Sequence, residues 1–67
     1  MSWRCLEHGV WHFDGLRRGY RLTISPSNHG RFYAVLTLHW IPQQQRAAAT
    51  LDEAKAWAEA IARDYTP

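Results

Sequence analysis

The sequence predicts an α+β fold: an antiparallel sheet of three or four strands with one C-terminal helix packed on one face. Two observations support this class. Residues 3–48 contain short segments in which apolar and polar side chains alternate, separated by turn-forming residues, as strands do. Residues 51–65 repeat apolar side chains at spacings of three and four, as an amphipathic helix does. A chain of 67 residues has room for one small core, so we expect a single domain over residues 1–67.

Two short strands are expected near the N-terminus. Residues 3–6 can form the first and residues 10–13 the second, because Gly9 interrupts the pattern between them. Residues 14–15, Asp-Gly, are a turn signal, and Gly19 is a second break. We therefore expect the next strand to begin directly after this glycine.

The centre of the sheet is expected at residues 20–24 and 31–41. The loop between them, residues 25–30, is dense in turn-forming residues. One face of the longer segment is entirely apolar: Phe32, Ala34, Leu36, Leu38 and Trp40. This alternation is typical of a strand with one buried and one partly exposed face. We expect the buried face to meet the helix, with Trp40 and Trp57 in the core.

The end of the sheet is expected near Pro42, because proline has no N–H to donate to a ladder. The three glutamines at residues 43–45 then indicate a loop. Residues 46–49 can add a short edge strand before the helix. On this interpretation the sheet spans about residues 3–48.

The helix is expected to begin after Thr50 and to run to about residue 65. Thr50-Leu51-Asp52-Glu53 matches a capping box, in which the Thr50 hydroxyl accepts from the Glu53 N–H and the Glu53 side chain reaches back. The apolar stripe consists of Leu51, Ala54, Ala58, Ile61 and Tyr65. Glu59 and Arg63, four residues apart, predict a surface ion pair.

The single cysteine and the absence of long apolar segments indicate the cellular compartment. Cys5 is the single cysteine, so no intramolecular disulfide can form, as is typical of a reducing cytosol. The first residues lack the apolar core of a signal peptide, and no apolar run approaches the roughly 20 residues that a membrane span needs. We therefore expect a soluble cytoplasmic protein with no membrane partner.

One group of residues resembles a metal site. Cys5, His8 and His12 form the pattern C-x2-H-x3-H, and both residue types bind zinc. A structural zinc site needs a fourth ligand, usually from a second close pair, and His29 and His39 are ten residues apart. The alternative is a small buried cysteine with two exposed histidines. The sequence also lacks nucleotide-binding and hydrolase motifs, so we expect no metal, no cofactor and no enzymatic activity.

Charge is divided unevenly along the chain. Residues 1–48 hold six arginines and two acids, whereas residues 49–67 hold four acids, one lysine and one arginine. A basic, aromatic sheet backed by an acidic helix predicts a contact surface on the sheet face opposite the helix. The partner-binding residues that we expect are Arg17, Arg18, Arg21, Arg31 and Tyr33.

Parts of the chain resemble known families. A Trp-containing first strand, Gly-Tyr-Arg-Leu-Thr-Ile at residues 19–24, a long aromatic strand, and Ala-Thr-Leu-Asp-Glu-Ala-Lys-Ala-Trp-Ala-Glu at residues 49–59 resemble small phage and prophage accessory proteins. Some of these are anti-CRISPR proteins, which implies an inhibitor that binds and blocks a host defence complex. The order of sheet and helix also resembles AP2 domains and integrase arm-binding domains, although the chain lacks their dense basic first strand. Neither resemblance assigns a site residue.

These observations predict a small non-enzymatic protein that binds and blocks a host protein or nucleoprotein complex. Direct DNA or RNA binding is the first alternative, since arginines neutralise phosphates and aromatic rings stack on bases. Seven arginines, one lysine and a net charge of +2 favour a protein partner, because Trp, Tyr and Arg are enriched at protein interfaces. A homodimer formed by an open strand edge is a further alternative. A solvated polar face without a partner also fits the arginines.

Overall fold

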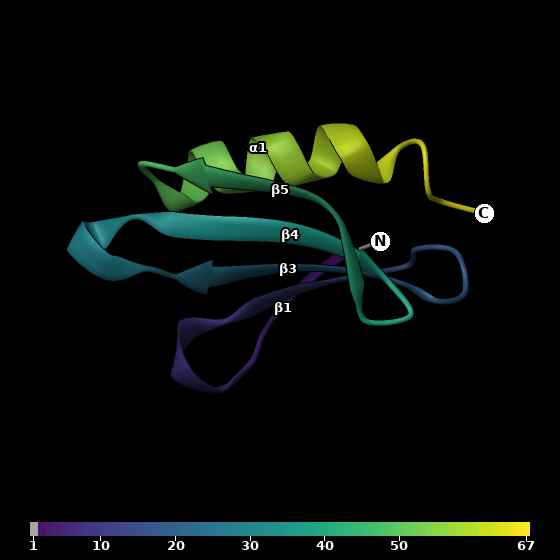
Figure 1. Ribbon diagram of the computed structural model, residues 1–67, viewed down its shortest axis with the longest axis horizontal. Helices are drawn as coiled ribbons and strands as arrows, with labels where there is room; N and C mark the ends of the chain where they lie inside the picture. The colour runs from purple at the N-terminus through teal and green to yellow at the C-terminus, as the bar shows by residue number, and fades with distance from the viewer. Residues whose placement is uncertain (1) are drawn as a thin grey trace.

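The computed structural model describes residues 2–67 as one antiparallel sheet and one C-terminal helix (Figure 1). The strands are β1 Ser2–Cys5, β2 Trp11–Asp14, β3 Tyr20–Pro26, β4 Phe32–Leu38 and β5 Ile41–Ala48, and the helix is α1 Leu51–Ala62. Two single turns of 3-10 helix, η1 Glu7–Gly9 and η2 Asn28–Gly30, connect β1 to β2 and β3 to β4. The predicted α+β class and the C-terminal helix are confirmed.

The sheet is a meander in which each strand pairs with the next along the chain, in the order β1-β2-β3-β4-β5. The predicted number of three or four strands is therefore wrong, because residues 2–67 form five. The extra strand is β5, which includes the predicted loop at residues 43–45 and, up to Ala48, the short edge strand predicted at residues 46–49. Glutamine has a low strand preference by itself, but pairing with β4 supplies the hydrogen bonds that hold this edge in place.

Pro42 lies inside β5 instead of ending the strand before it. It is opposite Thr37, at a shift of register between Leu36 and Thr37. Proline is tolerated on edge strands and at bulges, where its missing N–H does not break the ladder. The strand predicted at residues 31–41 accordingly ends at Leu38 and is followed by a two-residue turn.

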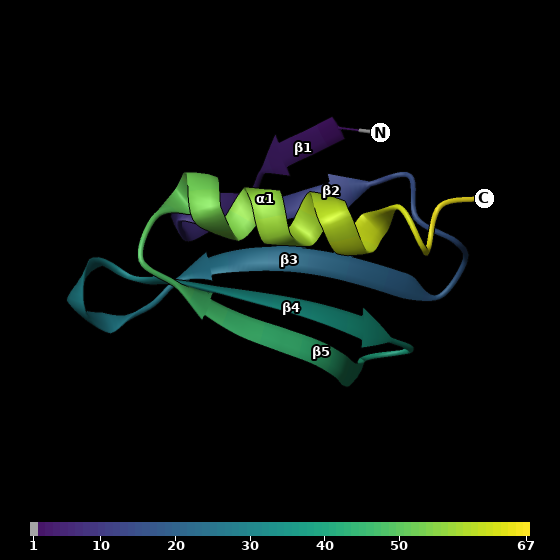
Figure 2. The same ribbon diagram turned by 90° about the horizontal axis from the view of Figure 1, so that it is seen from above.

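The core lies between the sheet and α1, which Figure 2 shows lying across the sheet. Its buried residues are Phe13, Leu22, Ile24, Ala34, Leu36, Ala48, Ala54, Ala58 and Ala62. The helix contributes only alanines to this fully buried set, so its backbone can approach the large side chains of β3 and β4 closely. Trp57 packs against the core as predicted, but Trp40 does not: it is 74% exposed.

The helix begins as the sequence predicts. The Thr50 hydroxyl accepts a hydrogen bond from the Glu53 N–H at 3.1 Å. The predicted pairing of Glu59 with Arg63 is replaced by a contact to the sheet, because Glu59 Oε1 accepts a hydrogen bond from Trp3 Nε1 at 3.1 Å. Lys55 Nζ lies 3.9 Å from the centre of the Trp11 ring. The described residues contain no helix that is long and apolar enough to cross a membrane.

Candidate functional site

The sheet face opposite α1 is the first part of the candidate site, and we call it the open face. Leu22 and Ile24 are buried beneath the helix, so the alternating residues of β3 point to the other side. The register places Tyr33, Val35 and Thr37 of β4 beside them. The open face of these two strands thus carries Arg21, Thr23, Ser25, Tyr33, Val35 and Thr37, and within residues 2–67 no helix covers it.

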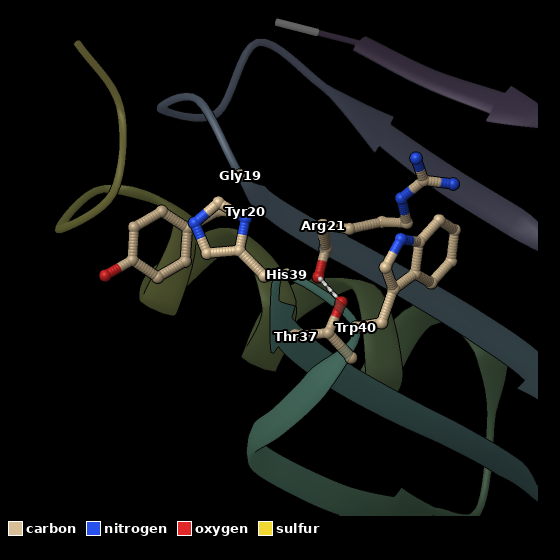
Figure 3. A pocket seen from close by; sticks show the side chains of 6 residues that line it. All are labelled: Gly19, Tyr20, Arg21, Thr37, His39 and Trp40. Atoms are coloured by element: carbon tan, nitrogen blue, oxygen red, sulfur yellow. Dashed lines mark hydrogen bonds between the residues drawn. The ribbon is translucent and has the colours of Figure 1, made fainter.

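The most exposed large apolar side chain on this side belongs to Trp40. The guanidinium carbon of Arg21 lies 4.1 Å from the centre of the Trp40 ring, with the cation over the indole (Figure 3). Such a contact at an exposed site stabilises by about 0.5–1 kcal/mol. The arginine therefore holds the indole beside the sheet without burying it.

The backbone that presents Trp40 is unusual. His39 and Trp40 form the two-residue connection between β4 and β5, with φ of 50° and 71°. Positive φ at both positions is the signature of a type I′ hairpin turn, which strongly favours Asn-Gly or Gly-Gly. For residues with a Cβ the left-handed conformation costs about 1–2 kcal/mol each. Sheet pairing on both sides offsets this cost, and the turn holds both rings outside the core.

A pocket of about 200 Å³ lies at this turn, lined by Gly19, Tyr20, Arg21, Thr37, His39 and Trp40. Figure 3 shows the His39 imidazole on one side and the Trp40 indole on the other, with Thr37 between them. The Thr37 hydroxyl donates a hydrogen bond to the Arg21 carbonyl oxygen at 3.3 Å, which joins β3 and β4 at this point. The volume is below the roughly 300 Å³ of small-molecule sites, so it suits a single chemical group.

The structure brings two of the five predicted contact residues onto the open face. Arg21 and Tyr33 both lie there, and Tyr33 OH donates a hydrogen bond to Gln45 Oε1 of β5. Arg21 is opposite Thr37, four residues from Tyr33 along β4, which corresponds to about 13 Å along the strand.

The other three predicted residues lie outside the open face. Arg17 belongs to the connection between β2 and β3, where its Nε donates to the Thr66 carbonyl oxygen at 3.3 Å and its N–H to the Tyr65 carbonyl oxygen at 2.7 Å. It holds the C-terminal segment. Arg18 is exposed in the same connection, close in sequence to the pocket. Arg31 lies at the opposite end of the sheet, directly before β4.

A second polar group occupies the β1–β2 side of the sheet. Asp14 Oδ1 lies 3.5 Å from an Arg4 guanidinium nitrogen and 3.2 Å from His12 Nδ1. Arg4 and His12 are opposite each other in the ladder. The carboxylate of Asp14 is therefore already engaged by two neighbours.

The Cys5, His8 and His12 pattern does not converge. Cys5 is exposed, which contradicts its interpretation as a buried residue, and its ladder partner is Trp11. His8 lies in η1, whereas His12 contacts Asp14 from β2. In the part of the chain that the structure describes, no three His, Cys, Asp or Glu side chains are grouped as metal ligands would be.

The sequence pattern predicted Trp40 in the core, and it placed His39 on the outward face of its strand without including it among the contact residues. One signal could have located the turn: the predicted strand at residues 31–41 has eleven residues, whereas typical strands have about five or six.

The comparisons with known proteins found no matching family model, curated protein or solved structure.

Proposed function

We propose that the chain is a non-enzymatic binding protein that docks on a host protein or nucleoprotein complex through the open face, with Trp40 as its anchor. One observation carries this proposal: a tryptophan that is 74% exposed is held in a turn of unfavourable backbone conformation. Strain of this kind persists where the surrounding structure enforces it, and it is concentrated at functional sites. Exposed tryptophan beside arginine is also the composition of interface hot spots.

The charges near the open face favour a protein surface over a nucleic acid. Arg4 is paired with Asp14, and Arg21 lies against Trp40. A nucleic-acid reader neutralises several phosphates, and its affinity depends on the number of cations that reach them. One unpaired guanidinium next to aromatic and hydroxyl groups fits the mixed chemistry of a protein interface better.

The mode of action that we propose is steric. The pocket is small, and the hydroxyl of Thr37 in its lining already donates to the Arg21 carbonyl oxygen. A rigid sheet with one anchor residue can occupy a surface and exclude its normal partner. This is the mode that the resemblance to anti-CRISPR proteins implies.

Photo-crosslinking tests the proposal. With Trp40 retained, a benzophenone amino acid in place of the neighbouring Ile41, which is 64% exposed, should crosslink one host protein after irradiation in a bacterial lysate. The same group at position 56, exposed on α1, is the matched control and should not give that product. Equal labelling from both positions, or labelling of a second copy of the chain alone, would contradict docking on a host partner.

Direct nucleic-acid binding remains the second candidate because an exposed indole is also a platform for a base. A mobility-shift assay at low salt with single-stranded DNA and RNA decides between the two. Binding that weakens steeply with salt, with a smaller slope for Arg21→Ala, would support this candidate.

A further inference from the structure

The pocket presents hydrogen-bond donors from different directions. Trp40 supplies its indole N–H and His39 a ring N–H, since even a neutral imidazole has one donor nitrogen. Figure 3 shows the five-membered ring of the indole on the side of His39 and its six-membered ring on the far side. Within residues 2–67 no side-chain hydrogen bond involves Trp40 Nε1 or either imidazole nitrogen of His39. Each ring can therefore donate to an acceptor group that enters the pocket.

One cationic side chain lines the pocket, that of Arg21. Asp14, the acid on β2, is held by Arg4 and His12. Among the described residues Arg21 has no ion-pair partner.

We infer that this pocket binds the carboxylate of an aspartate or glutamate side chain on the protein partner. The inference rests on the proposed docking function and specifies the chemistry that the open face recognises. A carboxylate is planar and accepts several hydrogen bonds, which fits a space between two ring donors. Because it ends a side chain, it can enter a pocket of about 200 Å³. A phosphodiester lies within a chain and carries a substituent on each side, so it fits this space poorly.

Binding of a carboxylate in the pocket would fix how the partner is oriented on the open face. The Trp40 indole contributes apolar contact area, and the acceptor group fixes the orientation of the partner through charge-assisted hydrogen bonds. A partner with an amide in place of the acid would keep the shape but lose the charge. Partners with an acidic side chain at the anchor position should therefore be selected.

An NMR titration of the ¹⁵N-labelled full chain tests the inference. The probe is glutamate blocked as its N-acetyl α-amide, and the matched control is the equivalent glutamine compound. The Trp40 indole N–H resonance should shift saturably with the glutamate probe, and the glutamine probe should bind about tenfold more weakly. The indole resonances of Trp3, Trp11 and Trp57 are internal references and should stay in place.

Variants and a third probe complete the test. Arg21→Gln should weaken binding of the glutamate probe, whereas Arg31→Gln, at the other end of the sheet, should not. Equal shifts with both blocked amino acids, or no saturable shift, would overturn the inference. Tighter binding of dimethyl phosphate would also overturn it and indicate a nucleic-acid backbone. Failure here with continued crosslinking from position 41 would leave the docking function intact and remove only the acidic partner.

Discussion

The His39 imidazole packs directly on the backbone of Gly19. A Cβ atom at residue 19 would lie 2.7 Å from His39 Cε1 and 3.0 Å from His39 Nε2. The Gly19 carbonyl oxygen accepts a hydrogen bond from the His39 N–H at 2.9 Å. Gly19 also has φ of 90°, a conformation that residues with a Cβ rarely adopt. This contact joins the β2–β3 connection to the β4–β5 turn and fixes one wall of the pocket.

Gly19→Ala is expected to destabilise the protein more than Gly30→Ala does. Both glycines have positive φ, which costs an alanine about 1–2 kcal/mol. A Cβ at Gly30 would meet no heavy atom within 4 Å, whereas one at Gly19 would collide with His39. Urea denaturation measures the difference in free energy of unfolding. Equal losses for the two variants would show that the imidazole moves aside freely.

The double substitution His39→Asn/Trp40→Gly is expected to stabilise the fold and abolish partner binding. Asn-Gly is a preferred type I′ turn: glycine removes the strain of about 1–2 kcal/mol at residue 40, and asparagine tolerates the conformation at residue 39. It also loses the contact of Trp40 with Arg21, which is worth about 0.5–1 kcal/mol. We expect a net gain of about 1 kcal/mol, or roughly 4–8 °C in Tm. Thermal unfolding and the crosslinking assay from position 41 measure the two effects. A less stable variant would mean that the turn is not strained.

Ala58→Leu is expected to destabilise the protein by about 1–3 kcal/mol, because added methylenes overpack a close interface. Ala58 is fully buried between α1 and the sheet. Ala56→Leu is the matched control on the exposed side of the same helix and should change the free energy of unfolding by less than about 0.5 kcal/mol. Chemical denaturation of both variants gives the comparison. A similar effect at both positions would contradict the close packing of the helix on the sheet.

Arg17→Ala and Arg18→Ala are expected to separate a structural arginine from a surface one. Arg17 donates to the Thr66 carbonyl oxygen, so its removal should loosen the C-terminal segment and cost about 0.5–1 kcal/mol. Arg18 is exposed, so its removal should leave stability unchanged within about 0.5 kcal/mol. Hydrogen exchange of the amides of residues 63–66 reports the difference. Faster exchange in the Arg18 variant alone would reverse the assignment.

Several parts of the fold could be predicted because local patterns encode them. Leu22 and Ile24 alternate with Arg21 and Thr23, and the register then places Arg21 away from the helix. The Thr50 cap is an interaction over three residues, so its residues are close together in the sequence. The candidate site could be predicted less well from the sequence. Only two of the predicted contact residues lie on the open face, and the exposed tryptophan was assigned to the core.

The sequence by itself determined the α+β class, the buried faces of the central strands and the start of the helix. These depend on side chains within a few residues of one another, whose spacing selects strand or helix. Only the tertiary structure decided that residues 41–48 are a strand and that His39 and Trp40 turn outward. Both outcomes depend on pairing between β4 and β5, which supplies the hydrogen bonds of a weak strand former and offsets the strain of two left-handed residues.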